Sequence, residues 1–100
     1  TLTGEIKVQN GDIHINEEVD RVYQRVTNPL LLKGRNRTIN IAATGSSSAI
    51  VWNPWIEKSK RMADMQNDAY KSMLCIETAN ALADARNLSL GEEHTLSAVF

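Results

Sequence analysis

Short runs in which apolar and polar residues alternate, separated by Gly, Asn, Ser and Pro, make up most of this sequence. Val, Ile and Thr recur in these runs, and such a pattern is typical of β-strands joined by turns. We predict strands over seven ranges: 13–15, 19–26, 30–33, 37–43, 49–53, 71–78 and 94–100. The sequence therefore predicts an all-β fold.

One segment departs from the alternation and predicts a single short helix. Asn53 is a favourable N-cap residue, and Pro54 suits the first helical position because its missing N–H would have no partner there. A helix over about residues 54–64 places Trp55 and Met62 on one face, as a helix that packs against a sheet requires.

Length, charge and cysteine usage limit the class of protein. One hundred residues are enough for one domain or a large piece of one. The formal net charge of -1 argues against a nucleic-acid-binding surface, and no run approaches the roughly 20 apolar residues of a membrane-spanning helix. The first residues do not resemble a secretory leader, and Cys75 has no second cysteine with which to form an internal disulfide. We therefore expect a cytoplasmic protein that binds neither nucleic acid nor membrane.

Polar residues on both faces of some predicted strands indicate that the chain belongs to a larger sheet. Asp20 and Arg21 are adjacent in one strand, so alternation turns them to opposite faces and one must face inward or lie at a sheet edge. Such a strand suits a large sheet that lines a polar cleft, and Thr1 stands where a complete chain would have Met. We expect residues 1–100 to form a single segment of one larger domain.

Glu77 is the carboxylate that most suggests a chemical role. Alternation places it on the same face as Met73 and Cys75, in a strand that is otherwise largely apolar. Burial of an unpaired carboxylate is costly, and desolvation makes a carboxylate a stronger base, which suits proton abstraction. The alternative is that the strand emerges into solvent at Glu77, and the pattern alone favours this alternative.

Asp20 is the second candidate, because aspartate is depleted in β-strands. It would either accept hydrogen bonds from paired sugar hydroxyl groups or form a salt bridge with Arg21 or Arg25. The pattern alone favours the salt bridge.

The remaining candidates give weaker signals. His14 and His94 are each isolated from other metal-ligating residues, so no metal site is predicted, and His94 is expected to face solvent at a turn. Cys75 is expected to be a buried, inert thiol. Trp52 and Trp55 would form either a platform for a sugar ring or part of the core.

Four blocks of sequence are informative in combination: Asp20-Arg21-Val22-Tyr23, Val51-Trp52-Asn53-Pro54-Trp55, Asn67-Asp68-Ala69-Tyr70-Lys71 and Cys75-Ile76-Glu77-Thr78-Ala79-Asn80. In order and spacing they resemble the carboxy-terminal part of the glucose-6-phosphate 1-epimerases. These enzymes, also called hexose-6-phosphate mutarotases, belong to the aldose 1-epimerase superfamily. The resemblance covers Asp12 to about Asn80, and Leu96-Ser97 is similar to the family's closing strand.

The resemblance implies a galactose-mutarotase-like β-sandwich (supersandwich) that is much longer than this chain and has a polar concave cleft. It implies that Glu77 is the catalytic base and that Asp20 contacts the sugar. The family's catalytic histidine and its phosphate-binding arginines lie in the earlier half, outside this chain. His14 and His94 match no motif of the family.

The implied reaction interconverts the α and β anomers of a hexose 6-phosphate by opening and re-closing the sugar ring. Glu77 would remove the proton on O1 while an upstream histidine protonates the ring oxygen, and Asp20 would hold hydroxyl groups. No metal or organic cofactor is expected, and the only partners expected are the hexose 6-phosphate and the remainder of the β-sandwich. We expect the segment alone to be inactive. Two alternatives stay open, namely a non-catalytic carbohydrate-binding relative and a purely structural fragment of the sandwich.

Overall fold

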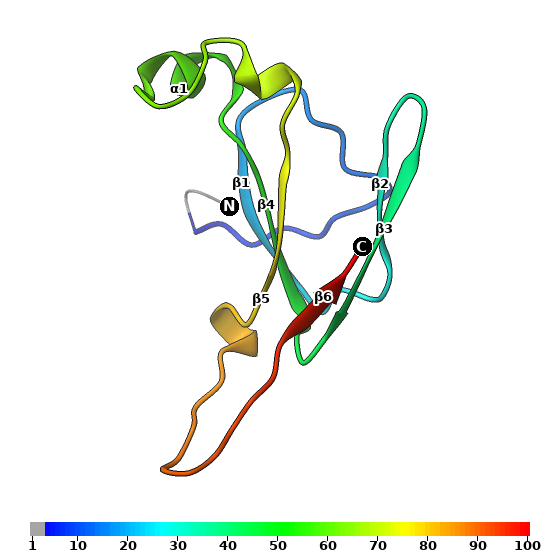
Figure 1. Ribbon diagram of the computed structural model, residues 1–100, viewed down its shortest axis with the longest axis vertical. Coiled ribbons are helices and arrows are strands. Elements are labelled where there is room, and N and C mark those ends of the chain that lie inside the picture. Colours follow the sequence, from blue (N-terminus) through cyan, green and yellow to red (C-terminus); the bar gives the residue numbers. More distant parts are fainter. Residues whose placement is uncertain (1–3) are drawn as a thin grey trace. The chain divides into compact units, whose positions relative to one another are not determined.

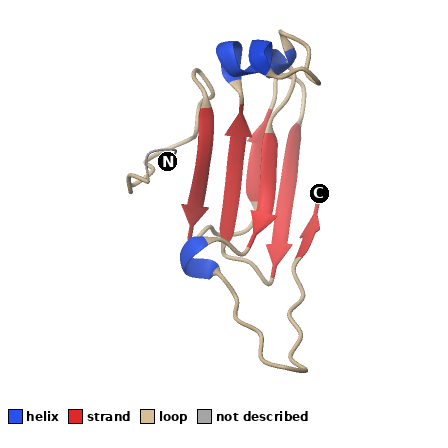
Figure 2. Cartoon of the chain, turned by 90° about the vertical axis from the view of Figure 1, so that its left-hand side faces the viewer, coloured by secondary structure: helices blue, strands red, loops and turns tan. Residues whose placement is uncertain are grey.

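A computed structural model describes residues 4–100 of the chain, and β-strands dominate it (Figures 1 and 2). In chain order the described elements are β1 (Val19–Gln24), β2 (Leu30–Lys33), β3 (Thr38–Thr44), β4 (Ser48–Asn53), helix α1 (Trp55–Arg61), the 3₁₀ helix η1 (Ala69–Lys71), β5 (Cys75–Ala79), the 3₁₀ helix η2 (Leu82–Asp84) and β6 (Ser97–Val99). The prediction of a mainly β chain with one short α-helix is confirmed for this part of the chain.

The described strands form two three-stranded sheets, in the orders β1-β4-β5 and β2-β3-β6. In the second sheet β2 and β3 are antiparallel, with Leu30 opposite Ile41 and Lys33 opposite Thr38. Strand β6 pairs antiparallel with the other edge of β3, from Ala42 opposite Val99 to Thr44 opposite Ser97. The long segment between β5 and β6, which contains the 3₁₀ helix η2, returns the chain to β3, where β6 pairs (Figure 1).

The chain divides into two compact units. One consists of residues up to 22 together with residues 50–76, and the other of residues 23–49 together with residues 77–100. The prediction that residues 1–100 belong to a single larger domain is not tested by this division and stays a prediction.

In the first unit, Asn53 joins the end of β4 to the start of α1. The side chain is only 2% exposed, and its Oδ1 accepts a 2.8 Å hydrogen bond from the backbone N–H of Trp55. Its Nδ2 donates to the carbonyl oxygens of Tyr70 at 3.0 Å and Met73 at 2.9 Å. Asn53 therefore connects the start of α1 to the residues that precede β5.

The aromatic ring of Trp55 packs edge-on against Tyr70, with ring centroids 5.0 Å apart and planes at 62°. The backbone of Trp55 has a φ of +57°, in the left-handed region that non-glycine residues seldom adopt. The hydrogen bond from its N–H to Asn53 and the contact with Tyr70 hold Trp55 in this conformation.

In the second unit, Asn28 joins the segment before β2 to Ala43 of β3. Its Oδ1 accepts a 3.0 Å hydrogen bond from the N–H of Ala43, and its Nδ2 donates to the carbonyl oxygen of the same residue. At the turn between β3 and β4, Gly45 has a φ of +75°, and a Cβ atom there would lie 2.0 Å from the carbonyl oxygen of Thr95. Only glycine fits this turn without displacing the chain that leads to β6.

Three predicted strands are wrong in part. The strand predicted over 71–78 is observed only at Cys75–Ala79, because Lys71 and Ser72 donate backbone hydrogen bonds to residues three positions earlier and form η1. The closing strand predicted over 94–100 begins only at Ser97, since His94 is engaged by the β3–β4 turn instead of a strand. The range 19–26 ends as a strand at Gln24.

The strand predicted at 13–15 is wrong, because no described strand pairs with this segment and alternation alone cannot supply the missing backbone partners. The helix predicted over about 54–64 is observed at Trp55–Arg61, so the Asn53-Pro54 start signal is right within one residue. None of the described helices combines the length and apolar character needed to cross a membrane.

The core of buried hydrophobic side chains among the described residues is small. It consists of Val19, Ala49 and Val51. By contrast, large apolar side chains near both ends of the chain are open to solvent, with Ile6 at 95%, Val8 at 84% and Phe100 at 88% exposure. So much uncovered apolar surface is what a segment of a larger β domain would show.

Candidate functional site

The two predicted site residues lie on the outer strands of the sheet β1-β4-β5, Asp20 in β1 and Glu77 in β5. Asp20 belongs to the first compact unit and Glu77 to the second.

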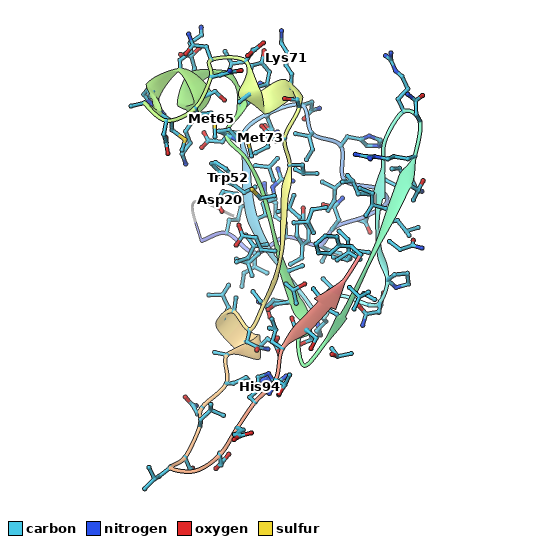
Figure 3. The ribbon with its side chains drawn as sticks, viewed as in Figure 1. Asp20, Trp52, Met65, Lys71, Met73 and His94 are labelled. Carbon is cyan, nitrogen blue, oxygen red and sulfur yellow. The ribbon has the colours of Figure 1, made fainter. Side chains whose placement is uncertain are left out.

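Asp20 is half-buried, and within residues 4–100 its carboxylate forms neither a hydrogen bond nor an ion pair (Figure 3). The neighbouring Arg21 instead contacts Glu17, with Nη2 3.1 Å from Oε1. The salt bridges with Arg21 and Arg25, which the sequence pattern favoured, are not formed among the described residues. The carboxylate of Asp20 is free to accept hydrogen bonds from a ligand.

Glu77 is the exposed residue of β5, between the half-buried Ile76 and Thr78. Its carboxylate likewise has no hydrogen bond or ion pair with any described residue. Glu77 thus faces solvent in this part of the protein, as the alternative favoured by the sequence pattern predicted. Any desolvation of the carboxylate has to come from a ligand or from chain outside this segment.

A cluster that the sequence did not predict surrounds Asp84, which is 8% exposed. Its Oδ2 accepts hydrogen bonds from the backbone N–H of Ser47 at 2.8 Å and from Nδ2 of Asn80 at 2.9 Å. Its Oδ1 accepts from Nη2 of Arg86 at 3.1 Å. The Ser47 N–H, the Asn80 amide and the Arg86 charge together hold the pKa of Asp84 well below the usual carboxyl range, against the opposing effect of burial.

Ser48, which is 1% exposed, extends this arrangement to the end of β5. Its Oγ lies 2.6 Å from the carbonyl oxygen of Ala79 and 3.3 Å from Oδ2 of Asp84. A serine hydroxyl has one proton, so the shorter contact identifies the Ala79 carbonyl as the main acceptor. The same Oγ accepts a 3.0 Å hydrogen bond from the N–H of Ala81, and the hydroxyl of Ser46 also donates to the Ala79 carbonyl.

We call Ser46, Ser47, Ser48, Asn80 and Asp84 the Asp84 cluster. It joins the β3–β4 turn to the chain that leaves β5. In the sequence, its members look like an ordinary polar loop, Ser46-Ser47-Ser48, and two isolated polar residues more than 30 positions later. No local pattern signals their contact, because it depends on how the turn and the strand end meet in three dimensions.

His94 is exposed, as predicted, but it is not free (Figure 3). Its Nε2 lies 2.7 Å from the carbonyl oxygen of Gly45 and 3.0 Å from Oδ1 of Asn80. Both of these oxygens are acceptors, since Nδ2 of Asn80 already donates to Gly45 and Asp84. Nε2 of His94 must therefore carry a hydrogen, which it donates to these oxygens.

Both tryptophan side chains contact other side chains of the first unit. The ammonium group of Lys58 lies 5.9 Å from the ring centroid of Trp52 and 3.3 Å from Oε1 of Glu18. Trp55 packs against Tyr70. These contacts favour packing over the sugar-platform alternative for both residues.

A pocket of about 350 Å³ opens in the first unit. Its lining consists of Ile15, Asn53, Trp55, Tyr70, Lys71, Met73 and Leu74. The amide of Asn53 makes its hydrogen bonds within the protein, and the ammonium of Lys71 lies 5.9 Å from the Tyr70 ring centroid.

Cys75 is half-buried and has a free thiol, and His14 is exposed. Within residues 4–100, no three His, Cys, Asp or Glu side chains are arranged to hold a metal ion.

Comparison with known proteins assigns the chain. The family model described as aldose 1-epimerase matches residues 2–100. The chain belongs to the aldose 1-epimerase family. The resemblance drawn from the four sequence blocks is thereby confirmed.

Three relatives are described as putative glucose-6-phosphate 1-epimerases. The chain is 36% identical over 88 residues to the protein of Cenchrus ciliaris, a match that covers 85% of this chain and 26% of the relative. It is 40% identical over 68 residues to the protein of Haemophilus influenzae, covering 66% of this chain and 24% of the relative. The match to the Escherichia coli protein is 33% identical over 67 residues and covers 65% and 23% of the two chains.

The chain thus spans about a quarter of the length of these relatives. No solved structure gives a significant match to it.

Proposed function

We propose that the protein to which this chain belongs interconverts the α and β anomers of a hexose 6-phosphate, with glucose 6-phosphate as the first substrate to test. Membership of the aldose 1-epimerase family and the names of the relatives support the reaction class and the substrate. The observation that carries the proposal is the free carboxylate of Glu77, which lies on β5 in the Cys-Ile-Glu block and has no partner among the described residues.

Glu77 is the proposed base. Opening of the ring requires removal of the proton on O1 while the ring oxygen gains a proton, and a carboxylate without an internal hydrogen bond is free to take the first of these protons. The acid is assigned to a histidine in the part of the protein outside this chain. Rotation about the C1–C2 bond and re-closure then give the other anomer. Loss of the O1 proton forms the C1=O1 carbonyl as the C1–O5 bond breaks and the ring oxygen gains a proton, and re-closure reverses these changes, so the scheme includes no cofactor.

Asp20 is the proposed sugar-binding residue. Its half-buried carboxylate is open to a ligand, and it has acceptor sites for two neighbouring hydroxyl groups. Hydrogen bonds of this kind orient the sugar and leave the proton transfers to other groups.

The remaining three quarters of the same protein are the proposed partner of this segment. The exposed Ile6, Val8 and Phe100 and the outer strands β1 and β5 would be covered when the larger β-sandwich is complete. A cytoplasmic location is part of the proposal, since a reducing compartment is compatible with the free thiol of Cys75.

The test is anomer exchange of glucose 6-phosphate, measured by NMR with the full-length protein and its Glu77→Gln variant. We expect the wild type to exceed the spontaneous exchange rate and the variant to lose most of this acceleration. If both proteins bind the sugar phosphate and neither accelerates exchange, the protein is a carbohydrate-binding relative and the enzymatic proposal is wrong.

A further inference from the structure

We propose that Ser48, supported by Asp84, is a positioning residue for the reaction because it fixes the end of β5 and thereby the place of Glu77. The inference rests on the proposed function of Glu77 as the base. It adds a role for two buried polar residues that contact the end of β5 and the residues just after it.

The hydroxyl of Ser48 bridges two backbone groups that follow Glu77. It donates to the carbonyl oxygen of Ala79 at 2.6 Å and accepts from the N–H of Ala81 at 3.0 Å. Ala79 lies two residues after Glu77, so the two residues point to the same side of the strand. Because Ser48 is 1% exposed, water does not compete for either hydrogen bond.

Asp84 holds the turn that leads into Ser48, the first residue of β4. Its Oδ2 accepts from the backbone N–H of Ser47 at 2.8 Å and from Nδ2 of Asn80 at 2.9 Å, so one carboxylate oxygen contacts both the turn and the chain leaving β5. These donors favour the ionised carboxylate, and hydrogen bonds to an ionised acceptor are stronger than those between neutral groups.

The end of β5 needs such support. Among the described residues, β5 is an outer strand bonded only to β4, and an outer strand has little to prevent local opening at its end. A displacement of about 1 Å in a reacting group can reduce the rate by about 100-fold. A rigid end of β5 therefore has a direct effect on how well Glu77 is aligned with O1 of the sugar.

The decisive experiment is a double-mutant cycle in the full-length protein, with anomer exchange of glucose 6-phosphate as the readout. Ser48→Ala removes the hydroxyl without adding bulk, and we expect kcat to fall about 10-fold with KM within about twofold of wild type. When Glu77 is already Gln, the same change should cause no further loss, because Ser48 then has no base to position. Ser89→Ala, at an exposed position of the same unit, is the matched control and should leave both parameters unchanged.

Three results would overturn the inference: no loss in the Ser48→Ala protein, an equal loss in both backgrounds, or a rise in KM alone. Failure of the proposed function looks different, since either the wild type would not accelerate exchange at all or the Glu77→Gln variant would keep wild-type activity. If Ser48→Ala does not fold, as judged by circular dichroism, Ser46→Ala takes its place. Ser46 is half-buried, and its hydroxyl contacts the Ala79 carbonyl and the backbone of Ser48, so we expect a smaller loss that again vanishes when Glu77 is replaced.

Discussion

The backbone N–H of Ser47 donates a 2.8 Å hydrogen bond to Oδ2 of Asp84, which lies 37 positions later in the chain. This contact joins the β3–β4 turn to η2, and the amide of Asn80 reinforces it from the end of β5 at 2.9 Å. The β3–β4 turn thus meets the segment that follows β5 at one ionised carboxylate, although the two segments are more than 30 positions apart in the sequence. Stability, pH dependence and the placement of Glu77 should all be sensitive to this contact.

Asp84 predicts a specific dependence of stability on pH. Its pKa in the folded protein is lowered from the ordinary value of 3.8, so its stabilising effect is present in full above 3.8. The effect decreases as the pH falls below that value and is lost once the pH passes through the lowered pKa. We expect Asp84→Asn to lower the urea midpoint at neutral pH, and this difference from wild type to shrink as the pH falls below about 4.

The matched control for Asp84 is Asp64→Asn, at an exposed position. Urea unfolding of the full-length proteins across the acidic range provides the measurement. Parallel curves for wild type and Asp84→Asn would show that the carboxylate does not have the lowered pKa.

The close approach of Gly45 to Thr95 predicts a large difference between two similar glycine substitutions. Gly45→Ala places a Cβ 2.0 Å from the carbonyl oxygen of Thr95, whereas the site of Gly91→Ala has no atom within 4 Å. Both glycines have positive φ values, +75° and +85°. Gly91→Ala should therefore cost only about 1 kcal/mol of unfolding free energy for the left-handed backbone, and Gly45→Ala about 1–3 kcal/mol more.

Thermal unfolding measures both glycine substitutions. The hydrogen bond between His94 and the carbonyl of Gly45 should also weaken in Gly45→Ala, which a change in the His94 ring resonances would report. Equal destabilisation by the two substitutions would contradict the observed contact.

Asn53 predicts a stability effect in the first unit. Asn53→Ala removes three hydrogen bonds and leaves the N–H of Trp55 and the carbonyl oxygens of Tyr70 and Met73 without this partner. We expect a loss of about 2–4 kcal/mol in unfolding free energy, measured by urea unfolding. Asn36→Ala, in the exposed loop between β2 and β3, is the control and should change the free energy by less than about 0.5 kcal/mol. A loss as small as that of the control would show that the Asn53 contacts are not made.

Local sequence patterns predicted those parts of the fold that depend on neighbours along the chain. The alternation of apolar and polar residues identified β2 and most of β1, β3 and β4, and Asn53-Pro54 identified the start of α1. Alternation failed at residues 13–15, where no described strand provides a partner, and at Lys71, where short backbone hydrogen bonds form a 3₁₀ helix instead. A strand requires a neighbour, and the neighbour is not part of the local pattern.

The candidate site, too, could be predicted only where a local sequence pattern or the family resemblance signals it. Glu77 and Asp20 were identifiable because a carboxylate in a strand is unusual and because the surrounding blocks resemble a known family. Ser48, Asn80 and Asp84 were not, since serine, asparagine and aspartate in loops are ordinary residues of turns. Only the meeting of the β3–β4 turn with the end of β5 distinguishes them.

Asp20 predicts a change in substrate affinity. In the full-length protein Asp20→Asn keeps the size of the side chain but replaces one acceptor oxygen with a donor, so paired sugar hydroxyls lose one of their acceptors. We expect KM for glucose 6-phosphate to rise about 10-fold or more, with a smaller effect on kcat. Asn carries no charge, but Asp20 has no ion pair among the described residues, so stability should change little. An unchanged KM would exclude Asp20 from the sugar-binding site.

The most direct measurement compares Glu77→Gln with Glu57→Gln in the full-length protein, using NMR exchange of the glucose 6-phosphate anomers. Both residues are exposed glutamates, but Glu57 lies on α1, 3.9 Å from the ammonium of Lys60, and has no proposed chemical role. We predict that Glu77→Gln lowers kcat by about 100-fold or more, as expected for loss of a general base, while Glu57→Gln retains wild-type exchange. Equal activity of the two variants would contradict the assignment of Glu77 as the base.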